Sequence, residues 1–195
     1  MTMNEIEEYK KKRFVGRNGR LLEEWETIAN RFQDNEEIGV TIRERNGDGL
    51  PVVYEVVYKI RSFCGIKRND QNELEEPLFA DEFVMRISIG NNYPSCDGNL
   101  DIRFLAKDMF GNNIPHPFHP NILYFGDAGK VCVRELAQGT YTDLAVYIDK
   151  VARYLRYEQY HALSQPPYPI DEKVAAWVID QGEPQGWIET LKNLN

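Results

Sequence analysis

The chain has 195 residues, of which 42% are hydrophobic and 28% charged, a composition typical of a soluble globular domain. Its 23 Lys and Arg against 31 Asp and Glu give a formal net charge of −8, which argues against nucleic-acid binding because such surfaces must neutralise phosphates. No apolar run approaches the roughly 20 residues needed to span a bilayer, and the N-terminus lacks a signal-peptide core. We therefore expect neither a nucleic acid nor a membrane as partner.

The chain begins with a charged stretch, residues 4–14, which fits either a short helix or a frayed arm. Residues 20–32 then carry apolar side chains at helical spacing and predict an amphipathic helix with one buried face. The exposed face of this helix is expected to carry its acidic residues, Glu23, Glu24 and Glu26.

Segments in which apolar and polar residues alternate follow this helix. The alternating segments are 38–43, 52–60, 83–89 and 100–104. A strong turn signal, Asn46-Gly47-Asp48-Gly49, separates the first two, and the polar stretch 67–76 predicts a loop. Short alternating strands joined by turns indicate a four-stranded antiparallel meander, which the preceding helix covers on one face.

A long segment without clear helix or strand, residues 106–131, comes next. Gly and Pro punctuate it, and its aromatic residues indicate a packed, functional loop. Helices are predicted over 143–157, from near Asp171, and around Trp187. This order predicts an α+β domain. We assign residues 18–195 to a single domain and residues 1–17 to an N-terminal arm or extra helix.

Two side chains of the loop region suggest acyl-transfer chemistry. A lone cysteine is more often a small buried hydrophobe than a nucleophile, but Cys132 lies just after a glycine-marked turn beside polar groups. A thiolate there can form a thioester, and the side-chain amide of Asn121 can donate a hydrogen bond to the oxyanion of the tetrahedral intermediate. The three cysteines have no C-x-x-C spacing, which indicates free thiols in a reducing, cytoplasmic setting.

The histidines of the loop offer two other interpretations. A zinc site made by His116, His119 and Cys132 lacks an obvious fourth ligand, so no metal is expected. A cysteine hydrolase would need a histidine base, yet His116 and His119 lie in a Pro-bent loop where supporting the backbone is the more ordinary task. No papain-like or caspase-like signature accompanies Cys132.

Several short motifs occur in one order along the chain. They are Phe83-x-Met85-x-Ile87-x-Ile89, Asn92-Tyr93-Pro94, Ile102-x-Phe104, His119-Pro120-Asn121-Ile122 and Gly129-Lys130-Val131-Cys132-Val133. Together they resemble the ubiquitin-conjugating enzyme (UBC) family, over roughly residues 18–192. The resemblance implies a UBC-like fold with an N-terminal helix, a four-stranded meander, an active-site loop and C-terminal helices.

The resemblance also implies a role for each motif residue. Cys132 matches the cysteine that accepts the C-terminus of a ubiquitin-like protein as a thioester from an activating enzyme. Asn121 matches the asparagine that stabilises the oxyanion or orders the loop, and His119 and Pro120 match residues that support the loop. The modifier then passes to an amine on a protein substrate, and the family uses no cofactor at this step.

The chain departs from the family pattern at several points. The loop 123–128 is enlarged beside the thiol, and the first helix is acidic where family members are often basic. Such divergence resembles the UBC-like proteins of bacterial ubiquitin-like conjugation operons, some of which serve in antiviral defence. Ser164 and His161 fall near the position where the family orients the incoming lysine, but Ser164 also fits a helix-terminating surface residue. A catalytically inactive UBC-like module that only binds a modifier or partner remains the alternative function.

Overall fold

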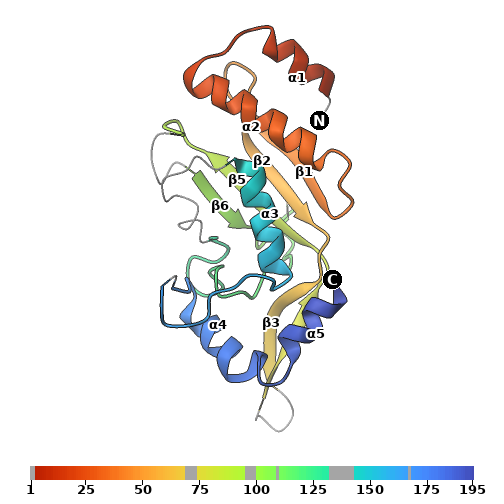
Figure 1. Cartoon of the computed structure of the whole chain (residues 1–195), viewed down its shortest axis with the longest axis vertical. Helices are drawn as coiled ribbons and strands as arrows, with labels where there is room; N and C mark the ends of the chain where they lie inside the picture. Colours follow the sequence, from red (N-terminus) through yellow and green to blue (C-terminus); the bar gives the residue numbers. More distant parts are fainter. Residues whose placement is uncertain (1–2, 69–73, 95–99, 109, 132–142, 167) are drawn as a thin grey trace.

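The computed structural model of the protein describes residues 3–68, 74–94, 100–108, 110–131, 143–166 and 168–195, and it confirms the α+β class. Helices and strands lie along a long, narrow molecule, with α1 and α2 at one end and α4 and α5 at the other (Figure 1). The elements in chain order are α1 (Met3–Lys10), α2 (Gly16–Phe32), β1 (Ile38–Arg45), β2 (Pro51–Tyr58), β3 (Ser62–Arg68), β4 (Glu75–Ala80), β5 (Phe83–Ile89), β6 (Leu100–Phe104), α3 (Leu144–Leu155), α4 (Glu172–Trp177), the π-helical turn η2 (Val178–Gly182) and α5 (Trp187–Leu194).

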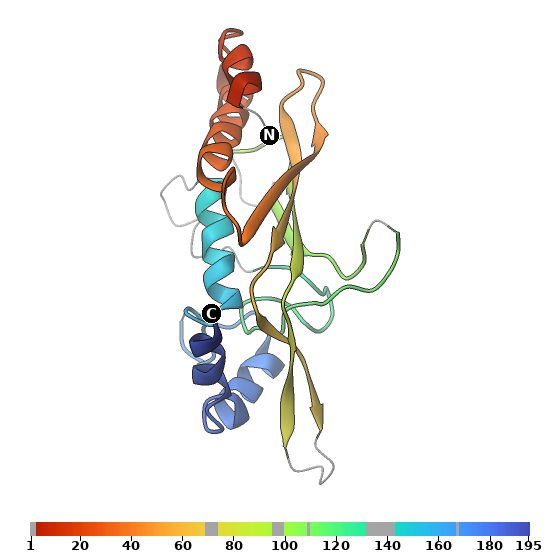
Figure 2. The same cartoon turned by 90° about the vertical axis from the view of Figure 1, so that its right-hand side faces the viewer.

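The main sheet contains four strands in the order β1-β2-β5-β6, and each neighbouring pair is antiparallel. Alternate residues of β2 and β5 are buried, as their sequence patterns predict, because α2 and α3 lie on the same face of the sheet (Figure 2). Tyr54, Val56 and Tyr58 point into this layer together with Met85 and Ile87, and all five side chains are fully buried. The main core therefore lies between the sheet and these two helices.

The N-terminal residues form α1, which packs against α2 rather than remaining a frayed arm. Ile6 is fully buried, and the ring of Tyr9 meets the ring of Trp25 edge-on at 5.3 Å. The second helix begins at Gly16, two residues before the domain boundary expected at residue 18. α1 therefore contributes to the main core.

Glu24 corrects one expectation for α2, because its side chain is buried instead of exposed. A charged residue at this helical position was expected to face solvent, but Arg20 on the preceding turn and Tyr93 from the segment after β5 both reach its carboxylate. Glu23 is exposed, as predicted, and Glu26 is partly buried. The acidic surface of α2 is thus smaller than the sequence suggests.

A two-stranded antiparallel hairpin, β3–β4, replaces part of the predicted loop 67–76. It projects beyond the main sheet, and α4 and α5 lie beside it (Figures 1 and 2). Trp177 holds β4 by donating its indole N–H to the carbonyl of Glu75 at 2.8 Å, and the Glu75 N–H donates to Gln181 Oε1 at 2.7 Å. These contacts come from the far end of the chain, which is why the local polar sequence did not predict them.

A second hydrophobic core joins this hairpin to the C-terminal helices. Phe63 of β3 contacts the rings of Tyr157 and Trp177 edge-on at 5.0 and 5.6 Å. Phe118 also meets Trp177 edge-on at 5.2 Å, and it directly precedes His119. The second core therefore supports the loop that carries the predicted site.

Candidate functional site

The loop from His119 to Val131 folds back on itself and is fixed to the edge of the main sheet. Ile122 pairs with Val131 in an isolated antiparallel bridge, and Val131 donates its N–H to the carbonyl of Ile102 in β6 at 3.0 Å. Leu123 donates to Lys130 at 2.9 Å, which closes the turn between them. The backbone on both sides of the enlarged loop 123–128 is therefore held in one position.

Gly129 is required where this loop meets β6. Its φ of +92° lies in the left-handed region, and a Cβ built there would stand 2.2 Å from the carbonyl oxygen of Phe104. The Gly129 carbonyl accepts the Phe104 N–H at 2.8 Å. The glycine thus allows the loop backbone to approach the sheet two residues before Val131.

His119 is fully buried and bonded at both ring nitrogens. Nδ1 accepts the N–H of Asn121 at 3.1 Å, so the ring proton lies on Nε2, which donates to the carbonyl of Gln159 at 3.2 Å. The ring stacks on Tyr154 and meets Tyr157 edge-on. Burial lowers the pKa of His119 to about 3, so the imidazole is neutral near pH 7 and has no free lone pair for use as a base.

Asn121 is 2% exposed, and its side-chain oxygen accepts the backbone N–H of His161 at 3.0 Å. This bond assigns the two ends of the amide, because only the oxygen can accept. The Nδ2 group remains as a two-proton donor. An asparagine held in this way can donate a hydrogen bond to an oxyanion without first rearranging.

Pro120, between these two residues, is buried, and its carbonyl oxygen accepts two N–H groups from the chain before α4. Ile170 donates at 2.9 Å and Asp171 at 3.0 Å. The predicted loop residues His119, Pro120 and Asn121 therefore lie together, and each is hydrogen-bonded to the chain that follows α3.

Asp171 also belongs to this region, although its sequence position predicts only the start of a helix. Its side chain is 4% exposed and caps α4, and it also accepts the backbone N–H groups of Tyr124 and Phe125 at 2.9 and 3.1 Å. A helix-capping Asp has a recognisable sequence position, but nothing local to it indicates a contact with the enlarged loop.

Cys132 lies outside the described residues, so its predicted role stays a prediction. The structure describes Val131, the residue bonded to it, and Leu144, which opens α3. Ser164, the other residue considered for orienting an acceptor, is exposed. His161 approaches Asn121 through its backbone N–H.

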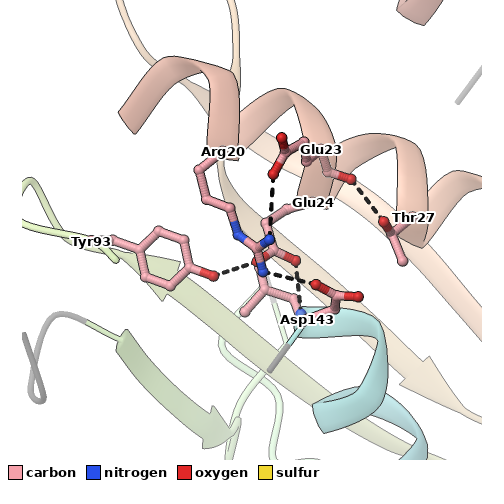
Figure 3. A network of polar contacts seen from close by, with 7 residues as sticks. Arg20, Glu23, Glu24, Thr27, Tyr93 and Asp143 are labelled. Carbon is pink, nitrogen blue, oxygen red and sulfur yellow. Dashed lines mark hydrogen bonds and ion pairs between the residues drawn. The ribbon is translucent and has the colours of Figure 1, made fainter. Parts of the chain in front are cut away.

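A buried polar network surrounds Glu24 at the start of α3 (Figure 3). The carboxylate accepts a hydrogen bond from the Tyr93 hydroxyl and another from the Leu144 N–H at 2.8 Å. Arg20 pairs with Glu24 at 2.7 Å and with Asp143 at 2.8 Å. Burial raises the pKa of Glu24, and the hydrogen bonds and Arg20 oppose this shift. The network fixes the first residue of α3 to α2.

The described part of the chain contains no group of three His, Cys, Asp or Glu residues placed to bind a metal ion. His116 is partly buried, and burial lowers its pKa. Among the residues described, no helix is long and apolar enough to cross a membrane.

No protein-family model and no curated protein sequence matches this chain. Among solved structures, human ubiquitin-conjugating enzyme E2 G1 is similar to it, with 15% sequence identity and a TM-score of 0.42. The similarity covers 73% of this chain and 98% of the human chain.

Proposed function

We propose that this protein is a ubiquitin-like protein conjugating enzyme that carries the modifier as a thioester on Cys132. It receives the modifier C-terminus from an activating enzyme and passes it to an amine on a protein substrate in the cytoplasm. The bacterial operon type, with a role in antiviral defence, is part of the same proposal. Genes for an activating enzyme, a modifier and a deconjugating protease beside the coding gene would support this origin, and their absence would count against it.

The proposed reaction has two acyl-transfer steps. In the first, the Cys132 thiolate attacks the thioester carbonyl of the modifier on the activating enzyme, and the thiolate of that enzyme leaves. In the second, the neutral amine of the substrate attacks the new thioester, loses a proton to solvent water, and expels the Cys132 thiolate as an amide bond forms. Each step passes through a tetrahedral oxyanion, and Asn121 is the proposed donor to it in the second.

The observation that supports this proposal is that the chain directly after Asn121 pairs with the chain directly before Cys132. Asn121 Oδ1 is engaged by His161, which leaves Nδ2 as the donor, and Ile122 pairs with Val131, the residue bonded to Cys132. One such donor supplies about 2.7–4 kcal/mol to acyl transfer in other enzymes. His119 is neutral and hydrogen-bonded at both ring nitrogens, so it fits the role of a loop support better than that of the general base that a cysteine hydrolase requires.

Charging with the modifier tests the first step. The protein is incubated with the activating enzyme encoded beside it, ATP and the modifier, and a thiol-sensitive adduct is expected. Cys132→Ala should form no adduct, and Cys132→Ser should form an ester that survives reducing agent. An adduct on Cys132→Ala would overturn the assignment. A wild-type protein that never charges would instead favour the inactive binding module.

Asn121→Asp tests the second step. The ionised aspartate still accepts the His161 N–H but no longer donates, and its charge lies at a position that is 2% exposed. We expect normal charging and a discharge to free amine that is slower by about 10²- to 10³-fold. Asn121→Ala, by contrast, also leaves the His161 N–H unpaired and should lose about 1–3 kcal/mol of stability. Discharge of Asn121→Asp at the wild-type rate would refute the oxyanion role.

A further inference from the structure

The Asp171 carboxylate is buried and accepts four backbone N–H groups from two separate parts of the chain. Oδ1 accepts from Lys173 at 3.2 Å and Val174 at 3.1 Å, which caps α4. Oδ2 accepts from Tyr124 at 2.9 Å and Phe125 at 3.1 Å, in the enlarged loop. The two oxygens therefore have different tasks, one in the helix and one in the loop.

Asp171 also contacts the loop on the other side of Asn121. Its backbone N–H donates to the carbonyl of Pro120, as does that of Ile170. Asn121 thus lies between two points, Pro120 and Tyr124, that the same residue holds. Capping a helix needs only one side-chain oxygen, and Ser, Thr or Asn would supply it. The second oxygen of the carboxylate is what reaches the loop.

We infer that Asp171 is a positioning residue for Asn121 and that its Oδ2 contacts set the loop geometry that the aminolysis step needs. This inference rests on the proposed conjugating function. The Tyr124 and Phe125 N–H groups are partly buried, so without Asp171 they need other partners and the loop moves to find them. A shift of about 1 Å in a group that orients a reacting centre can cost about 10²-fold in rate.

The two tasks of Asp171 can be separated by substitution. Asp171→Ser keeps an oxygen that caps α4 but is too short to reach Tyr124 and Phe125 as well. Asp171→Asn also retains a capping oxygen and turns an NH₂ group toward the two loop N–H groups, which cannot accept from it. Asp127→Asn is the matched control, because Asp127 is exposed on the same loop and its carboxylate faces Arg103 at 3.2 Å.

Amide hydrogen exchange and single-turnover discharge are measured on the full chain and on each variant. In Asp171→Ser and Asp171→Asn we expect exchange at Tyr124 and Phe125 to rise about fivefold to tenfold, with Lys173 and Val174 little changed. Discharge should slow by about tenfold to hundredfold with charging unchanged and the same amine concentration for half-maximal rate. Asp127→Asn should match the wild type in every measurement.

Each other outcome overturns a stated part of this inference. Unchanged exchange at Tyr124 and Phe125 would show that Asp171 does not hold the loop. Raised amide exchange with discharge at the wild-type rate would show that the contact has only a structural role. A charging rate that falls as much as the discharge rate would show the same. A wild-type protein that does not charge refutes the proposed function and the positioning role with it, while exchange still decides the contact itself.

Discussion

Acidification should destabilise this protein through His119. The folded state holds the ring neutral and lowers its pKa from 6.5 to about 3, while the unfolded chain takes up a proton near its ordinary value. The unfolded state therefore binds more protons at acidic pH. The contribution of His119 to the free energy of unfolding is fully present above about pH 6.5 and is lost as the pH falls toward about 3. Between about pH 7.5 and 5.5 the loss from this one group is about 1.4 kcal/mol, or tenfold in the unfolding equilibrium.

Urea unfolding at both pH values, for the wild type and His119→Gln, measures this contribution. The glutamine does not titrate and can still donate to the Gln159 carbonyl, so the pH-dependent loss should be smaller in the variant by about 1.4 kcal/mol. Contributions from His116, whose pKa is also lowered, and from Glu24, whose pKa is raised, occur in both proteins and cancel in the difference. Equal losses in the two proteins would refute the assignment of a neutral, buried His119.

Two further substitutions, measured by urea unfolding, test the contacts that hold the chain at Leu144, after Cys132 in the sequence, and at Gly129, before it. Glu24→Ala should lose about 2–3 kcal/mol of unfolding free energy, because the buried donors around it lose their acceptor. Glu23→Ala, at an exposed position, should change it by no more than about 0.5 kcal/mol. Similar losses in the two variants would contradict the buried network. Gly129→Ala should lose well over about 2 kcal/mol of unfolding free energy, because its new Cβ would clash with the Phe104 carbonyl. Gly126 also has a positive φ but no atom near its Cβ position, so Gly126→Ala should lose only about 1 kcal/mol. A Gly129→Ala variant as stable as Gly126→Ala would mean that the loop does not approach β6 this closely.

The main sheet and its covering helices follow from local sequence pattern. β5, over Phe83–Ile89, and β6, over Leu100–Phe104, have the predicted bounds because alternation records which side chains face a covered layer. α3 similarly matches the helix predicted over 143–157 to within two residues at each end. In these elements the neighbours along the chain decide the structure.

The contacts that the sequence did not predict join distant residues. Trp177 fixes the hairpin through Glu75, 102 positions earlier, and the Glu24 carboxylate accepts the N–H of Leu144, 120 positions later. The His-Pro-Asn loop was predicted from its motif. Its attachment to Asp171 was not, because Tyr124 and Phe125 contribute only backbone N–H groups, which nearly every residue carries. Tertiary packing, rather than local propensity, decides these positions.

The division of the interior into two cores should allow the two ends of the molecule to unfold separately. The second core, built by Phe63, Phe118, Tyr157 and Trp177, joins the hairpin β3–β4 to the C-terminal helices, while the larger one lies under the main sheet. Structural units of this kind can open separately, with the smaller opening at lower free energy. The loop belongs to both cores, because Phe118 is in the second and Ile122 and Val131 are in the larger one. Opening of the second core alone would therefore release the Phe118 side of the loop while the Val131 side stays on the sheet.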